Sequence, residues 1–304
     1  MTEVGALELG GTRAVVCVGG GPDQHGPVVE IATTSPEETL DAVCAAFETF
    51  RREGRVFDRI GVASFGPIGV DPARPGFGRI GSTPKPGWSG ADVAGVLERR
   101  LGAAVVLDTD VNGAAVGEGL WGAAAGLRSH AYITVGTGVG VGLVIEGRPV
   151  HGHSHPEGGH LRVRRASGDD YPGRCPWHRD CLEGLICGPA LEARLGFRAE
   201  EARDDDPVWT LVGYYLGEAC AMLALTAAPE RIVIGGGVGR RPEVLAEARR
   251  ALGTALAGYV AALPEPVLDR YLVSPGLGGR SGLFGAMAMA LNTSDERLAN
   301  DCII

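Results

Sequence analysis

Residues 4–18 read VGALELGGTRAVVCV, two apolar runs on either side of a short glycine turn. Such runs around a Gly-Gly pair predict two antiparallel β-strands joined by a tight turn. Residues 131–146, AYITVGTGVGVGLVIE, repeat the arrangement of strand, glycine turn and strand. The chain therefore contains the same supersecondary unit twice.

Alternating helices and strands follow each hairpin. Ser35 before Pro36, with Glu38 three residues later, is a capping box that predicts a helix over 36–53. Further helices are expected over 91–101, 113–121, 189–195, 207–227 and 282–291 and from Pro242, and further strands over 59–64, 103–107 and 231–234. This order predicts two related α/β halves with a ligand cleft between them. The hairpins argue against a purely parallel Rossmann sheet.

A cluster of metal-binding residue types lies between residues 160 and 181. His160 is followed by Cys175-Pro176-Trp177-His178-Arg179-Asp180-Cys181, a C-x2-H-x2-C knuckle. Thiolate sulfur and imidazole nitrogen are the ligands that Zn²⁺ prefers, and four of them make a closed tetrahedral site. The alternative is that these are ordinary loop polar residues and small core cysteines. We expect a zinc site at His160, Cys175, His178 and Cys181.

Three glycine-rich turns are candidate phosphate sites. Glycine lets backbone N–H groups approach an anion, so the turns at Gly10-Gly11 and at Gly136 and Gly138 can hold phosphates, with Thr12 and Thr137 as hydroxyl donors. Gly235-Gly236-Gly237, between a strand and a helix, suits an adenosine or its α-phosphate. Each turn taken alone also fits plain turn chemistry.

Acidic residues close one strand and open a helix at Asp108-Thr109-Asp110-Val111-Asn112. Carboxylates at the carboxyl end of a strand point into the active crevice of α/β folds, and one of them can accept a hydroxyl proton. The competing interpretation is that Asp110 or Asn112 caps the helix.

The composition is that of an acidic globular protein. The 304 residues include 37 acidic and 28 basic side chains, which gives a net charge of −9 and argues against a nucleic-acid partner. No run of eighteen apolar residues predicts a membrane span, and no secretory signal is recognisable. We expect a cytoplasmic protein without a membrane partner, whose seven cysteines (17, 44, 175, 181, 187, 220 and 302) are reduced.

These motifs together resemble the ROK sugar kinases (repressor, open reading frame, kinase), and within them the bacterial zinc-containing fructokinases. The resemblance covers nearly the whole chain. It is carried by ELGGTR at 8–13, SFGPI at 64–68, STPKPGW at 82–88, DTDVN at 108–112, GTGVG at 136–140, HPEGGH at 155–160, the zinc knuckle, CLEG at 181–184, GPA at 188–190 and GGGVG at 235–239.

The resemblance implies an actin-like ATPase (ribonuclease H-like) α/β fold of two similar domains. We expect residues 1–117 with the C-terminal helix 282–304 to form one, and 118–281, with the zinc loop 151–187, the other. It also implies transfer of a phosphoryl group from Mg-ATP to a hexose, most readily D-fructose at its 6-hydroxyl, by a homodimer. The implied ions are a structural Zn²⁺ and the Mg²⁺ that accompanies ATP.

The resemblance also implies roles for individual residues. Asp110 is the implied general base. Lys85, Thr109, Asp110, Glu157 and Glu183 are the implied sugar contacts. The implied ATP site comprises Gly10, Gly11, Thr12, Arg13, Thr137, Gly138, Pro189, Gly235, Gly236, Gly237, Val238 and Gly239. Trp88 is expected at the mouth of the sugar site.

Two departures leave alternatives open. Thr109 stands where the glucokinases of the family have asparagine, and Glu8 and Arg13 stand where aspartate and lysine are frequent in actin-like kinases, so the placement of Mg²⁺ is open. A glucokinase, mannokinase or N-acetylhexosamine kinase is the alternative enzyme. A DNA-binding, sugar-responsive regulator is a distant alternative, because the first strand begins near Val4 and the charge is acidic.

Overall fold

The computed structural model describes residues 2–260 and 262–292, which form two compact units. Within this range, unit 1 comprises 2–121, 152–155 and 280–292, and unit 2 comprises 122–151 and 156–279 without residue 261. Residues 293–304, among them Cys302, lie outside the described part of the chain.

Unit 1 contains a mixed sheet in the order β3-β2-β1-β5-β6, with β4 also paired to β2. The strands are β1 (Val4–Leu9), β2 (Arg13–Gly21), β3 (Gln24–His25), β4 (Val29–Ala32), β5 (Arg59–Ser64) and β6 (Ala104–Thr109). β1 and β2 pair antiparallel from Val4↔Gly19 to Leu9↔Ala14, whereas β1, β5 and β6 run parallel. The predicted opening hairpin and the prediction of a mixed sheet are both confirmed.

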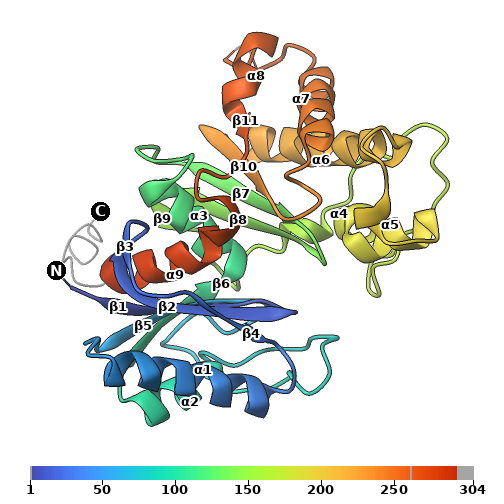
Figure 1. Ribbon diagram of the computed structural model, residues 1–304. Coiled ribbons are helices and arrows are strands. Elements are labelled where there is room, and N and C mark those ends of the chain that lie inside the picture. The colour runs from blue at the N-terminus through green and yellow to red at the C-terminus, as the bar shows by residue number, and fades with distance from the viewer. Residues whose placement is uncertain (1, 261, 293–304) are drawn as a thin grey trace. The chain divides into compact units, whose positions relative to one another are not determined.

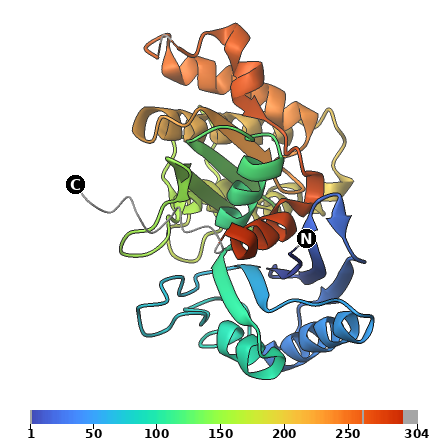
Figure 2. The ribbon, with the colours of Figure 1, turned by 90° about the vertical axis from the view of Figure 1, so that its left-hand side faces the viewer.

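Helices cover both faces of this sheet. α1 (Pro36–Arg52) and α2 (Val93–Leu101) lie on one face, and α9 (Ser281–Asn292) lies on the other beside α3 (Asp110–Trp121) (Figures 1 and 2). α1 begins at the predicted cap, where the Glu38 N–H donates to Ser35 Oγ at 3.3 Å. α2 begins two residues later than predicted, because the Asp92 carboxylate accepts from the Gly95 N–H at 3.0 Å and caps it.

Unit 2 repeats this topology in a sheet of order β11-β10-β7-β8-β9. Its strands are β7 (His130–Val135), β8 (Val139–Ile145), β9 (Arg148–Pro149), β10 (Arg231–Gly235) and β11 (Leu272–Val273). β7 and β8 form an antiparallel hairpin, and β7, β10 and β11 run parallel. The order β8-β7-β10-β11 thus matches β2-β1-β5-β6, as the repeated sequence predicted.

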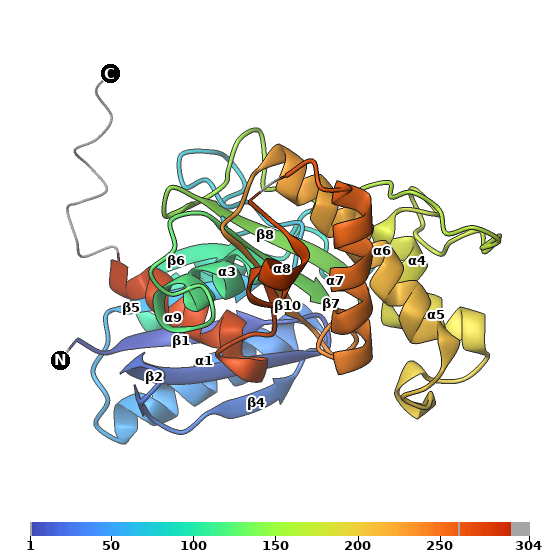
Figure 3. The same ribbon diagram turned by 90° about the horizontal axis from the view of Figure 1, so that it is seen from above.

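The helices of unit 2 are α4 (Leu182–Ile186), α5 (Gly188–Leu195), α6 (Pro207–Thr226), α7 (Pro242–Leu256) and α8 (Glu265–Tyr271), with 3₁₀ turns η1 (Gly158–His160), η2 (Ala199–Glu201) and η3 (Gly278–Arg280), the last at the junction with unit 1. α6 and α7 lie side by side (Figures 1 and 3). α6 is long and apolar enough to span a membrane by length and composition alone, but 67% of its apolar window is buried within the protein. This burial is typical of a core helix.

α3 and α9 cross with almost no side-chain atoms between them. A Cβ atom added at Gly285 would lie 1.7 Å from the Gly113 carbonyl oxygen, and one added at Gly117 would lie 2.7 Å from the Ser281 carbonyl oxygen. Beside this crossing, the Ser281 hydroxyl donates to the fully buried Glu118 carboxylate at 2.7 Å. The backbones of the two helices can approach this closely only because the contact residues are glycines.

Candidate functional site

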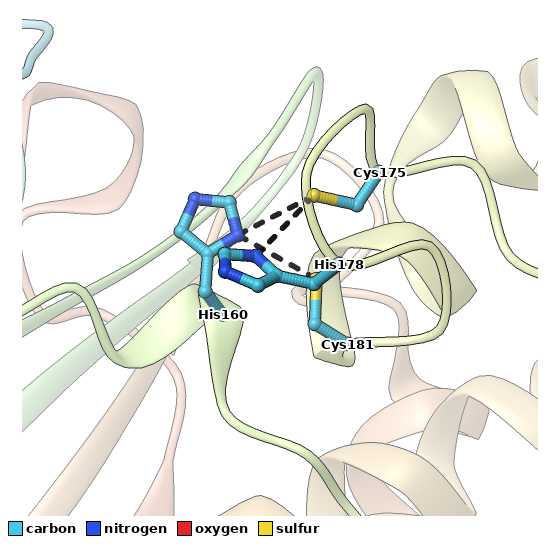
Figure 4. A group of neighbouring side chains, drawn as sticks. All are labelled: His160, Cys175, His178 and Cys181. Carbon is cyan, nitrogen blue, oxygen red and sulfur yellow. Dashed lines mark hydrogen bonds between the residues drawn. The ribbon is translucent and has the colours of Figure 1, made fainter.

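Two imidazoles and two thiols gather in unit 2 around one point. One ligand atom from each of His160, Cys175, His178 and Cys181 lies within 4.8 Å of the others (Figure 4). Cys175 Sγ lies 3.7 Å from Nδ1 of both histidines, and Cys181 Sγ lies 3.5 Å from His160 Nδ1. Zn–S bonds of about 2.3 Å and Zn–N bonds of about 2.0–2.1 Å at tetrahedral angles separate sulfur from nitrogen by about 3.6 Å. The four residues therefore fit a tetrahedral ion such as Zn²⁺.

Main-chain hydrogen bonds shape the knuckle that carries three of these ligands. The Cys175 N–H donates to the Arg179 carbonyl at 3.1 Å, and the Arg179 N–H donates back to the Cys175 carbonyl at 2.9 Å. Cys181 is the N-cap residue of α4, so the last ligand also starts a helix. A Cβ atom at Gly184 would lie 1.8 Å from the Arg179 carbonyl oxygen, so only glycine lets α4 pack against the knuckle.

His160 reaches the cluster from η1, which packs on β8. A Cβ atom at Gly159 would lie 1.8 Å from the Val139 carbonyl oxygen, so this turn lies directly against the strand. Trp177, 58% exposed, places its ring edge-on to the His160 ring at 6.1 Å. Burial raises the pKa of the Cys181 thiol to about 12. A thiolate there requires a nearby cation, which a bound metal ion supplies.

The second and third glycine turns meet at the end of β7. The Gly188 N–H, at the start of α5, donates to the Gly136 carbonyl at 2.7 Å. The Val238 and Gly239 N–H groups donate to the Val135 carbonyl at 3.0 and 3.2 Å. The structure therefore brings together three expected nucleotide segments of unit 2: residues 136–138, Pro189 at the start of α5, and 235–239.

Glu183 connects the knuckle to one of these turns. The Val139 N–H donates to Glu183 Oε2 at 3.1 Å. The Gly138 backbone is so close that an added Cβ would lie 2.8 Å from the same oxygen. Glu157, the other acidic residue expected in the sugar site of unit 2, is exposed, and its carbonyl accepts from the His160 N–H at 3.0 Å.

The end of β6 distinguishes the two candidate carboxylates of unit 1. Asp108 is 3% exposed, and its Oδ1 accepts from the Thr109 N–H at 2.7 Å and from Asn112 Nδ2 at 2.8 Å. Asp110 is partly exposed, at the first position of α3, and its Oδ1 accepts from the Val111 N–H at 2.9 Å. Of these two carboxylates, Asp110 is the one that a substrate can approach.

The cap of α3 is Thr109, which neither capping alternative had named. Its hydroxyl oxygen accepts from the Asn112 N–H at 3.2 Å, and the residue is only 3% exposed. The expected sugar contact at Thr109 therefore belongs to a side chain that already has a structural role at the start of the helix.

The first glycine turn is held by Thr33. The Thr33 hydroxyl donates to the Gly10 carbonyl at 2.8 Å, and the Thr33 N–H donates to the Thr12 carbonyl at 3.0 Å. Lys85 Nζ in turn donates to the Thr33 carbonyl at 3.1 Å. Two expected site segments, the turn at 10–13 and Lys85, are thus linked through a residue that the sequence did not single out.

Trp88 lies elsewhere than expected. It is fully buried, its indole N–H donates to the Thr34 carbonyl at 2.8 Å, and its ring packs edge-on against Phe65 at 5.2 Å. The prediction that it covers the mouth of a sugar site is wrong, because the ring fills the core and ties the 82–88 loop to the residues after β4.

The sequence predicts no role of its own for Glu8: it is the first residue of ELGGTR and a departure from other actin-like kinases. Burial, and next the charge of Asp110, raise the pKa of the Glu8 carboxyl to about 7, against the opposing effect of Arg13. A Cβ atom at Gly282, in the first turn of α9, would lie 2.8 Å from Glu8 Oε1. Two carboxyl groups, at 8 and 110, therefore interact beside the first glycine turn.

A second unforeseen feature is an ion pair between the zinc loop and α5. The Asp169 carboxylate accepts from Arg194 Nη1 and Nη2 at 2.8 and 2.9 Å and from the Tyr215 hydroxyl at 2.5 Å. The Asp169 and Arg194 side chains are 9% and 11% exposed. The Arg194 hydrogen bonds hold the pKa of Asp169 well below its usual range. This pair fixes the segment between the first and second metal ligands onto α5 and α6.

The ROK family model matches residues 4–293. The chain belongs to the ROK family. It is 40% identical over 287 residues to the fructokinase of Pediococcus pentosaceus, covering 94% of this chain and 97% of that protein. It is 37% identical over 296 residues to the fructokinase of Zymomonas mobilis, covering 96% and 97%.

A solved ROK structure has the same fold as this chain. The Streptomyces griseus ROK glucokinase in complex with glucose and AMPPNP superposes with a TM-score of 0.77 at 26% identity, covering 95% of this chain and 99% of that one. The two-unit α/β architecture described above is therefore the actin-like ATPase fold of the ROK sugar kinases.

Proposed function

We propose that this ROK protein transfers the γ-phosphoryl group of ATP to a hexose, with D-fructose as the preferred acceptor. The observation that carries the proposal is identity of 37–40% to fructokinases over at least 94% of the chain. The partly exposed Asp110 at the end of β6 supplies the carboxylate that the reaction needs.

In the proposed reaction the sugar 6-hydroxyl oxygen attacks the γ-phosphorus. The bond between that phosphorus and the bridging oxygen of ADP breaks, and the hydroxyl proton passes to the Asp110 carboxylate. Sugar phosphate and ADP leave, and the proton is released to solvent. Such transfers depend on positioning and charge stabilisation more than on covalent help, and Mg²⁺ enters with ATP as part of the substrate.

The remaining roles divide between sugar and nucleotide. Lys85, Thr109, Glu157 and Glu183 bind sugar hydroxyls in this proposal. The turn at Gly10–Arg13 holds phosphate, and Thr137, Gly138, Pro189 and Gly235–Gly239 hold the nucleotide. The hydrogen bonds among 135–139, Gly188 and 235–239 support one shared nucleotide surface. Zn²⁺ at the Cys/His cluster is structural, because four protein ligands leave no open position for chemistry.

The proposal extends to the protein's state in the cell: a cytoplasmic homodimer that binds no nucleic acid and no membrane. The acidic charge and the burial of α6 support the last two points. Light scattering of the purified protein tests the dimer, and a monomer at micromolar concentration contradicts it.

A hexose panel tests the acceptor. ADP release is coupled to a dehydrogenase and followed with fructose, glucose, mannose and N-acetylhexosamines. We expect the highest kcat/KM for fructose. A higher value for glucose or mannose would make the protein a different hexose kinase of the family, and no release with any sugar would contradict kinase function.

A further inference from the structure

Helix α4 lies between the metal cluster and the glycine turn that follows β7. Directly before its first residue, Cys181 supplies a metal ligand and is the N-cap. One turn later the Leu185 N–H donates to the Cys181 carbonyl at 3.1 Å. Between them, Glu183 Oε2 accepts from the Val139 N–H. The metal ligand Cys181 and the carboxylate of Glu183, which holds the turn, are thus separated by a single residue.

Helix α4 has little freedom to move independently of the knuckle on one side or of α5 on the other. On the knuckle side, Gly184 lies against the Arg179 carbonyl, and the Arg174 N–H donates to the Gly184 carbonyl at 2.9 Å. The Leu182 N–H donates to the Leu161 carbonyl at 2.8 Å, and Leu182 and Leu185 are buried. On the other side, the Cys187 N–H donates to the Glu183 carbonyl at 3.1 Å, just before α5 begins.

The turn is held at one point by this helix and at a second point by the start of α5. The Glu183 carboxylate binds the Val139 N–H, and the Gly188 N–H binds the Gly136 carbonyl. A five-residue helix has little stability of its own, because nucleating a helical turn is unfavourable. Its geometry therefore depends on its packing against the knuckle and the core, and the knuckle carries three of the four metal ligands.

We propose that Glu183 is a positioning residue that couples the metal site to the nucleotide turn at 136–139. With the ion bound, α4 holds the Glu183 carboxylate against the Val139 amide, and the turn keeps the conformation that receives phosphate. When the ion is removed, α4 loosens and the turn loses this hydrogen bond. The part concerning nucleotide rests on the proposed function, whereas the coupling itself does not.

Hydrogen exchange measures the coupling without any substrate. Peptides covering 136–141 are compared in the metal-loaded protein, the chelator-treated protein and metal-loaded Glu183→Ala. We expect faster exchange at 136–141 in both altered samples and unchanged exchange in peptides from β1 and β2. Unchanged exchange at 136–141 in metal-loaded Glu183→Ala would overturn the coupling. If the chelator-treated protein unfolds, His178→Ala, which lacks the exposed ligand of the four, takes its place.

Titration with ADP in the absence of sugar measures the consequence. We expect Glu183→Ala to raise the Kd for ADP about tenfold, in line with the loss of a charge-assisted hydrogen bond. Glu183→Gln keeps an oxygen acceptor and should restore the Kd to within about twofold of wild type. Glu192→Ala, which removes an exposed carboxylate of α5, is the matched control and should leave the Kd unchanged.

The two measurements separate the possible failures. Unchanged ADP affinity in metal-loaded Glu183→Ala would overturn the positioning role, and the absence of sugar keeps any sugar contact of Glu183 out of the result. Wild-type protein that binds no ADP would instead refute the proposed nucleotide site, even where the exchange data support the coupling.

Discussion

Asp110 offers the sharpest test at the level of single residues. Replacing it with asparagine removes the proton acceptor but keeps the size of the side chain and an oxygen for the Val111 N–H. We expect Asp110→Asn to lower kcat by a factor of about 10²–10⁴, while the Kd for ADP changes less than about threefold. Asp23→Asn, an exposed position in unit 1, is the control. Near-normal turnover in Asp110→Asn would remove the general base from the mechanism.

Glu8 predicts a pH effect on stability. Its pKa in the folded protein is about 7, above the ordinary 4.5. Between these values the folded chain keeps a proton that the unfolded chain releases, so the contribution of Glu8 is complete below pH 4.5 and is lost as pH rises through 7. We expect Glu8→Gln to gain about 2 kcal/mol relative to wild type between pH 5 and pH 8.

Thermal unfolding midpoints of wild type and Glu8→Gln across this pH range check the Glu8 prediction. If the midpoints of the two proteins change with pH in parallel, Glu8 ionises normally in the folded protein. Since the variant retains Asp110 and Arg13, any remaining slope reports other groups.

At the level of elements, the cap of α3 places the catalytic candidate. Thr109→Val removes the acceptor of the Asn112 N–H, and we expect it to lower stability by about 1 kcal/mol. Thr109→Ser keeps the oxygen and should restore stability. Because Asp110 is the next residue, kcat should follow the same order. Equal melting temperatures for the valine and serine variants would exclude the capping role.

The loop between His160 and Cys175 has its own anchor in the Asp169–Arg194 pair. Asp169→Asn leaves the Arg194 charge uncompensated, and we expect a loss of about 3 kcal/mol of stability at pH 7. The exposed neighbour, changed in Asp170→Asn, should have no effect.

The Asp169–Arg194 pair also makes wild type sensitive to acid. The depressed pKa of Asp169 means that the pair contributes fully above about pH 4 and loses its contribution as pH falls further. Denaturant titrations from pH 6 to pH 3 should therefore show wild type and Asp169→Asn converging at low pH. If the difference in stability between the two proteins stays constant with pH, the effect of the substitution comes from packing and not from the charge of Asp169.

Local patterns predicted the elements well and their tertiary environments poorly. Both hairpins, the Ser35 cap and the four residues of the metal cluster could be predicted, because turn chemistry and ligand spacing are local in sequence. The pairing of Asp169 with Arg194, 25 residues apart, could not, because no short-range pattern encodes it. The burial of Trp88 was missed for the same reason: its partner, Thr34, lies 54 residues away.

At the level of the whole molecule, the metal is expected to act on one unit only. The four ligands and the turn at 136–139 all belong to unit 2. Removal of the ion should therefore speed hydrogen exchange across 157–183 and leave unit 1 peptides such as 59–64 and 104–109 unchanged. Elemental analysis should find one zinc per chain. Equal loss of protection in both units would mean that the ion supports the entire fold.

The crossing of α3 and α9 has a consequence for how this chain can vary. Gly117 and Gly285 leave no room for an additional carbon atom against the opposing backbone, and Gly113 leaves none against the Ala63 side chain of β5. In a library that samples every amino acid at every position, these three sites should be among the most depleted of substitutions, alanine included. Close packing therefore restricts which amino acids these three positions can hold during evolution. Most other positions of the two helices should accept substitutions more readily.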